Sequence, residues 1–263
     1  MSCVVALLLL FLPREQPRLP AVPMTVERPC PLEIADESAR ANLRCLAETG
    51  ANWTFAFAYP RTAERIPALH QELRRRHRAA RAEFERVVAH ASRHPEGRFF
   101  HEQVFTVDAD LPELLALSHH VGEYSGGAHG WDAQDVLIWH RAGNRPLAFE
   151  QLFAAPATAS AEMRRLLCPA LAALAMQRRG PASQCPEPPY PAALLAGPSG
   201  KIETLRVPLG EIHGRAGGYW EVRIPVTPAI VAAVQAPLRA AFGVSEAAPR
   251  ACNNIHCIEG QRQ

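Results

Sequence analysis

Hydrophobic and polar positions follow two different periods along the N-terminal third of the chain. In NWTFAFAYP, residues 52–60, aromatic side chains occupy every second position, which is the period of a half-buried strand. From Thr62 to Ala91, apolar residues instead recur in steps of three or four or their multiples, which predicts one long amphipathic helix. The expected apolar face of this helix consists of Ile66, Leu69, Leu73, Ala80, Phe84, Val87 and Ala91.

The centre of the chain has the pattern of strands joined by turns. The segments FFHEQVFTVDAD (99–110), PELLALSHHVGEYSG (112–126) and WDAQDVLIWH (131–140) each predict a strand. Between the last of these and Leu147, the residues AGNRP have the composition of a hairpin turn. We therefore expect an antiparallel sheet in the middle of the protein.

The remaining segments complete an α+β pattern. Residues 35–47 predict a short helix, and two further helices are expected at about 159–176 and 228–242. Strands are expected near IETLRVPLGE (202–211) and GYWEVRIPV (218–226). The predicted fold class is α+β, an antiparallel sheet packed by one long and two shorter helices and stabilised by disulfides.

The N-terminal segment has the pattern of a targeting sequence. The apolar run from Val4 to Leu12 is shorter than the about 20 residues that cross a bilayer but suits the hydrophobic region of a signal peptide. We interpret residues 1–25 as a signal peptide or proline-rich leader, with a buried N-terminal helix or strand as the alternative. Residues 30–263 are expected to form one α+β domain, comprising residues 50–112, residues 113–245 and a cysteine-containing tail at 246–263. The expected location is periplasmic or secreted, without a stable membrane span in the mature form.

The cysteines predict disulfides. Of the seven in the chain, Cys3 lies in the leader, and the others form an even set that suits an oxidising compartment. Pairing of nearest neighbours is the simplest arrangement, although the sequence does not select it: Cys30–Cys45, Cys168–Cys185 and Cys252–Cys257. A metal site formed by Cys252, His256 and Cys257 is the alternative for the last pair.

Charge argues against a polyanionic partner. Lysine and arginine number 28 against 26 acidic residues, a net charge of +2, so no nucleic-acid partner is expected. The long predicted helix carries a basic face, Arg74, Arg75, Arg76, Arg78 and Arg81, interspersed with glutamates. A solvated face is the better interpretation, and a surface for an anionic partner is the alternative.

Histidines and a carboxylate gather between residues 119 and 129. On a helix, His119 and Glu123 would be neighbours and, with His120 and His129, would suggest a zinc site. The period of two predicts a strand, in which His119 and Glu123 lie about 13 Å apart. We therefore predict no metal and no cofactor. Ser125 as nucleophile with His129 as base is also weak, since no G-x-S-x-G motif or orienting carboxylate is identifiable.

The segment GEYSGGAHG, residues 122–130, instead predicts a turn between strands. Gly126 and Gly127 readily adopt positive φ, and His129 can hydrogen-bond across the turn. If this turn carries function, we expect it to bind through Tyr124, Ser125, His129 and Trp131.

The chain resembles a known family in this region. Glu123 to Gly130, then a strand at Val136 to His140, then Asn144 to Phe153 resemble the pattern Y-x-G-G-A-H, strand, G-K-x-L-x-L-x-D-L-F. That pattern belongs to a bacterial extracytoplasmic domain of unknown function found at the sensor end of the RsiV anti-sigma factor and beside the deacetylase module of PdaC. The resemblance covers roughly residues 50–243.

The resemblance implies a receptor rather than an enzyme. The RsiV type of domain binds the cationic protein lysozyme, a poor electrostatic match for a chain with net charge +2, so this ligand is not transferred. The resulting hypothesis is an exported, non-catalytic binding protein of the cell envelope whose partner is an envelope protein or a cell-wall fragment. The alternative is a peptidoglycan-directed hydrolase or deacetylase that uses His129.

Overall fold

The computed structural model describes residues 41–91, 98–177, 185–188, 190–211, 219–253 and 257–259. The predicted leader, Cys30, His256 and the start of the expected helix at 35–47 lie outside these ranges. The predicted α+β class with antiparallel pairing is confirmed. The strands divide between two sheets, of six and of five strands, rather than forming one.

The first sheet contains the strands β1 to β6 in sequence order: β1 Leu43–Thr49, β2 Trp53–Pro60, β3 Phe99–Asp110, β4 Leu114–Tyr124, β5 Trp131–His140 and β6 Arg145–Leu147. All neighbours pair antiparallel except β2 and β3, which are parallel because the long helix α2, Pro67–Ala91, joins them as a crossover. The prediction of a helix at 35–47 was wrong from Leu43 onward, where the chain forms the edge strand β1.

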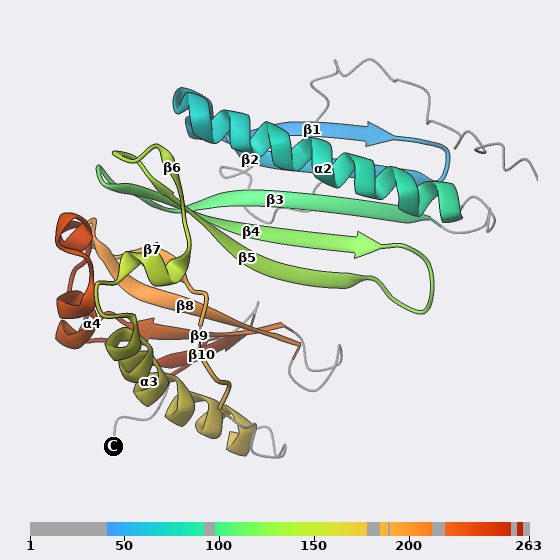
Figure 1. Ribbon diagram of the computed structural model, residues 1–263. Helices are drawn as coiled ribbons and strands as arrows, with labels where there is room; N and C mark the ends of the chain where they lie inside the picture. The colour runs from blue at the N-terminus through green and yellow to red at the C-terminus, as the bar shows by residue number, and fades with distance from the viewer. Residues whose placement is uncertain are drawn as a thin grey trace, which may run out of the picture.

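Helix α2 lies across one face of this sheet (Figure 1). It begins at Pro67, later than predicted, because residues 61–65 form the 3-10 helix η1 and proline favours the first helical position. Leu69, Leu73 and Phe84 are fully buried against the alternating aromatic residues of β2. The expected apolar face was partly wrong, since Val88 rather than Val87 is buried and His77 is buried with it.

The second sheet has the order β11-β10-β9-β8-β7, all antiparallel: β7 Ala193–Ala196, β8 Ile202–Glu211, β9 Tyr219–Pro225, β10 Arg250–Asn253 and β11 Cys257–Glu259. Helix α3, Pro156–Gln177, packs against it (Figure 1). The predicted last helix is broken into α4, Pro228–Ala233, and the 3-10 helix η4, Ala236–Ala241. Pro237 lacks the N–H that a continuous α-helix requires, which explains the break.

The two sheets share a hydrophobic core. Leu114, Ala116 and Ile138 from the first sheet belong to the same buried cluster as Leu205 and Trp220 from the second. Polar groups also join the sheets: the guanidinium of Arg206 on β8 donates to the hydroxyl of Ser118 on β4 and lies 3.4 Å from the carboxylate of Asp108 on β3. The first sheet is thus anchored at this end, while the ends of β3, β4 and β5 near the β4–β5 turn project away (Figure 1).

The disulfide predictions are tested in part. Cys168 and Cys185 are bonded, with Cα atoms 5.3 Å apart, and tie α3 to the segment before β7. Cys45 is also disulfide-bonded, while its predicted partner Cys30 lies outside the described residues. Cys252 and Cys257 stand opposite each other in the β10–β11 hairpin, but their side chains lie outside the described part of the chain. No helix among the described residues is long and apolar enough to cross a membrane.

Candidate functional site

The turn singled out in the sequence joins β4 to β5 at the projecting end of the first sheet. Gly126 and Gly127 have φ angles of +100° and +107°, a backbone conformation that residues with a Cβ rarely adopt. The hydroxyl of Tyr124 donates to the carbonyl of Gly127 at 2.8 Å, and the His129 ring bonds the carbonyl of Gly130 at 3.2 Å. Ser125 and His129 are exposed. These contacts fix the shape of the turn from within.

Aromatic side chains stand on both faces of the sheet beside this turn. Phe100 and Tyr124 are register partners on β3 and β4, and their rings stack at 6.3 Å between centroids. Trp131 pairs with Glu123 and therefore lies on the opposite face. Phe100 is 41% exposed and Trp131 46% exposed, which is unusual for side chains of this size. We call Phe100, Tyr124 and Trp131 together the aromatic end.

Two carboxylates flank a glycine on the face that carries Phe100 and Tyr124. Glu102, Gly122 and Asp132 are aligned across β3, β4 and β5. A Cβ at Gly122 would stand 2.9 Å from Oε1 of Glu102 and 3.3 Å from Oδ1 of Asp132, so the two carboxylate side chains lie close together over this glycine, which is buried beneath them. His120, on the same face, has Nε2 3.5 Å from Asp132. We call Glu102, Gly122, Asp132 and His120 with the two stacked rings the open face.

The opposite face of the same strands contains a buried chain of hydrogen bonds beneath α2. Nδ1 of His101 lies 2.8 Å from Oε2 of Glu123, Nε2 of Gln103 lies 3.0 Å from Nε2 of His101, and Nε2 of His119 lies 3.1 Å from Oε1 of Gln103. We call these four residues the buried chain. It links His119 to Glu123 through Gln103 and His101. The sequence had placed His119 and Glu123 too far apart to share one metal ion.

The bonding pattern fixes the position of each proton in the buried chain. An amide nitrogen can only donate, so Nε2 of His101 is an acceptor and its proton is on Nδ1, pointing to the Glu123 carboxylate. The amide oxygen of Gln103 can only accept, so Nε2 of His119 carries a proton. Neutral His119 then has a bare Nδ1, and this atom is buried without a hydrogen-bond partner among the described residues.

Aromatic packing holds the two histidines of the buried chain in place. The ring of His119 stacks on Phe105 at 4.1 Å and an interplanar angle of 3°, and His101 stacks on Phe55. Burial, aided by nearby Arg76, lowers the pKa of His119 from 6.5 to about 4, so its ring is neutral at pH 7. Burial also lowers the pKa of His77, which packs from α2 against Phe55 and Phe57.

This arrangement assigns different work to the ionisable groups near the turn. His101 and Glu123 are occupied with each other and covered, so they are not presented to a substrate. Within the described ranges, no three histidine, cysteine or acidic side chains are grouped so that they could hold a metal ion. On the open face, Phe100 and Asp132 are exposed, and Tyr124 and Glu102 are partly buried.

The basic face of α2 is largely paired within the protein. Arg75 and Arg76 lie 2.7 Å and 2.9 Å from the Glu72 carboxylate, and Arg81 reaches Glu48 on β1 at 2.8 Å. Arg75 is exposed, so its pair with Glu72 contributes little to stability, whereas the Arg81–Glu48 pair is largely covered; all three pairs compensate positive charge on the helix. This pairing supports the interpretation as a solvated face.

Sequence reasoning missed several members of these two faces. Phe100, His101, Glu102 and Gln103 come from β3, and Asp132 comes from β5, which the sequence identified only as strands. The alternation in FFHEQVF does place Phe99, His101, Gln103 and Phe105 on one face. What the sequence lacked was the register that brings β3 beside β4.

The described residues form two packed sheets, and the chain has low-level similarity to solved structures. A member of the DUF3298 family from Bacteroides fragilis is 15% identical, with a TM-score of 0.47 over 76% of this chain and 96% of that one. A DUF3298 family protein from Pseudomonas aeruginosa PAO1 is 15% identical, with a TM-score of 0.49 over 74% of this chain and 95% of that one. No protein-family model and no curated protein matches the chain. The similar structures belong to a domain of unknown function, and no ligand is taken from them.

Proposed function

We propose that this chain is an exported, non-catalytic binding protein of the bacterial cell envelope. Two features support the proposal. The pattern from Glu123 to Phe153 resembles the extracytoplasmic domain of RsiV and PdaC, and the disulfides at Cys45 and between Cys168 and Cys185 suit an oxidising compartment. The binding surface in this proposal is the open face, which includes the stacked rings of Phe100 and Tyr124, while Trp131 lies on the opposite face of the sheet.

The observation that carries the proposal is the exposed aromatic pair beside two carboxylates. The stacked rings of Phe100 and Tyr124 form a partly exposed apolar patch, and the carboxylates of Glu102 and Asp132 lie on the same face of the sheet. Sugar rings have apolar C–H faces and hydroxyl donors around their rim, which matches this arrangement. Of the two partner classes, an envelope protein or a cell-wall fragment, the geometry therefore favours the glycan of the cell wall.

Co-sedimentation of the protein with purified peptidoglycan tests the proposal. We expect saturable binding, and we expect Phe100→Ala to weaken it at least about tenfold, about 1.4 kcal/mol, because truncating a central aromatic contact has this size of effect. Met176→Ala is the matched control. Met176 is a 77% exposed apolar side chain on α3, which packs against the second sheet and not against the proposed binding face of the first. Equal binding by the wild type and Phe100→Ala would contradict the proposal.

The same assay separates binding from catalysis. The supernatant is analysed for soluble fragments and for released acetate, with His129→Ala in parallel. We expect neither product from any of the proteins. Release that depends on His129 would show that the hydrolase or deacetylase alternative is correct.

A further inference from the structure

A pocket lies at the other end of the first sheet, where the two halves of the molecule meet. Its volume is about 150 Å³, and it is lined by His140, Arg145, Leu147, Gln151, Gln235 and Leu238. The β5–β6 hairpin supplies its first three residues, the 3-10 helix η2, Phe149–Leu152, supplies Gln151, and the α4–η4 segment supplies the others. Along β5, His140 is about 30 Å from Trp131, so the pocket is separate from the aromatic end.

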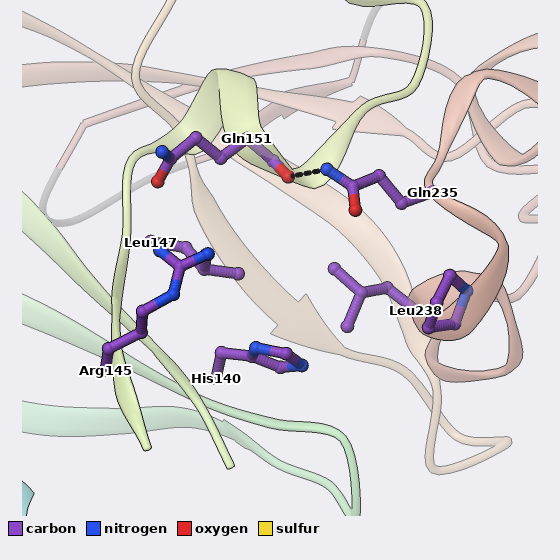
Figure 2. Close-up of a pocket in the computed structure, with 7 residues that line it drawn as sticks. His140, Arg145, Leu147, Gln151, Gln235 and Leu238 are labelled. Atoms are coloured by element: carbon purple, nitrogen blue, oxygen red, sulfur yellow. Dashed lines mark hydrogen bonds between the residues drawn. The ribbon is translucent and has the colours of Figure 1, made fainter. Parts of the chain in front are cut away.

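Arg145 brings a positive charge to the pocket that no described carboxylate pairs with. Its guanidinium makes no ion pair with the described residues, and its one hydrogen bond there is a long one, 3.4 Å, to the carbonyl of Pro146. Figure 2 shows this guanidinium beside Leu147 and the imidazole of His140 turned toward Leu238. Nδ1 of His140 is buried and has no hydrogen-bond partner in the part of the chain that is described. A cation and an imidazole are thus gathered at a site with apolar walls.

The two glutamines are held in fixed orientations at the pocket rim. Oε1 of Gln151 accepts from the backbone N–H of Ala148 at 2.9 Å. Nε2 of Gln235 donates to the backbone carbonyl of Gln151 at 2.6 Å, as the dashed line in Figure 2 marks. These bonds leave the Gln235 amide oxygen as an acceptor for a bound molecule, while the side-chain amide of Gln151 points away from the other lining residues (Figure 2). Together with the guanidinium of Arg145, this acceptor makes the pocket pre-organised for a ligand that both accepts and donates hydrogen bonds.

We propose that this pocket binds the terminal carboxylate of a small apolar residue, such as an alanine at the end of a peptide. The planar guanidinium of Arg145 matches a carboxylate in geometry and supplies one permanent positive charge, which suits a monoanion. Leu147 and Leu238 are both buried and form the wall for the methyl group. The Gln235 oxygen accepts from the peptide N–H. A cavity of about 150 Å³ is known to hold a molecule of benzene size, which is the scale of one alanine residue.

Titration of the full chain, observed through its backbone amide NMR signals, tests the proposal. The probe is N-acetyl-alanine, and N-acetyl-alanine amide is the neutral control ligand. We expect saturable shifts confined to signals of residues 140–151 and 235–238 for the acid, and at least about tenfold weaker binding for the amide.

Arg145→Gln removes the guanidinium from an exposed position, so the fold is expected to be retained. We expect this variant to bind the acid at least about tenfold more weakly. Arg75→Gln removes the same charge from the exposed surface of α2 and is expected to leave binding unchanged. Equal binding of acid and amide, unchanged binding by Arg145→Gln, or no saturable shifts around the pocket would each overturn the proposal. None of these outcomes bears on binding at the open face.

Discussion

The two faces of β3, β4 and β5 carry the same kinds of side chain and use them in opposite ways. On the face beneath α2, His101, Glu123 and His119 are buried; His101 bonds Glu123 directly, and Gln103 links His101 to His119. On the open face, His120 and Asp132 are half exposed beside stacked aromatic rings. Successive residues of a strand point to opposite faces, so His119 is buried beneath α2 whereas its neighbour His120 is partly exposed on the open face. The groups beneath α2 are covered by the helix, whereas His120 and Asp132, 3.5 Å apart, remain partly exposed on the open face.

The largest expected difference between the faces is in stability. Glu123→Ala leaves the Nδ1 proton of His101 buried without an acceptor, and we expect it to lower the free energy of unfolding by about 3 kcal/mol. Glu102→Ala makes the same change on the open face and is expected to cost less than about 1 kcal/mol. Urea unfolding at pH 7 measures both. Similar losses in the two variants would remove the distinction between the faces.

A pH dependence is also expected from the buried chain. In the unfolded chain His119 takes up a proton near pH 6.5, whereas in the folded protein burial lowers its pKa to about 4. Between these values the unfolded chain binds more protons, so the stabilisation is complete above pH 6.5 and is lost as pH falls toward 4. For His119 alone this loss is on the order of 3 kcal/mol.

Urea unfolding between pH 7 and pH 4 isolates this contribution when the wild type is compared with His119→Gln, which cannot titrate. Burial raises the pKa of Asp108, so this carboxyl favours folding more as the pH falls, opposite to His119. Its contribution is the same in the wild type and in His119→Gln and cancels when the two are compared. The change in the free energy of unfolding with pH is expected to be smaller in His119→Gln than in the wild type. It is expected to be unchanged in His129→Gln, a substitution in the exposed turn. A slope that His119→Gln leaves unchanged would show that His119 titrates normally.

The smallest expected change in stability concerns the turn that joins β4 to β5. Gly127 has a φ of +107°, and a Cβ there would meet no atom within 4 Å, so Gly127→Ala tests the backbone conformation alone. We expect a loss of about 1 to 2 kcal/mol in thermal or urea unfolding. Gly122→Ala, in a strand, is expected to lose less than about 1 kcal/mol, since the nearest atom is the flexible end of Glu102. Gly127→Ala with wild-type stability would show that the turn does not need a glycine.

Local patterns predicted much of this fold. The alternation from Trp53 to Tyr59 gave β2, and the spacing of Leu69, Leu73 and Phe84 gave α2, because each depends only on which residues face the core. The same patterns failed at Leu43–Thr49, where pairing with β2 overrides a helical pattern, and at Pro237, where a proline interrupts an apolar run.

The surfaces were harder to predict because they depend on strand register and on contacts between distant segments. His101 bonds Glu123 only because β3 and β4 pair with that register. Arg145 and Gln235 line one pocket only because the β5–β6 hairpin packs near the α4–η4 segment. Neither relation is encoded in residue spacing along the chain. The turn at Gly126 and Gly127 could be predicted because the need for positive φ is local.

The two faces of one sheet are expected to separate binding from stability. The most direct measurement determines peptidoglycan affinity and unfolding free energy together for Phe100→Ala. We expect affinity to fall at least about tenfold while the free energy of unfolding changes by less than about 1 kcal/mol. Unchanged affinity, or a loss of affinity that accompanies unfolding of the protein, would contradict the assignment of the open face as the binding surface.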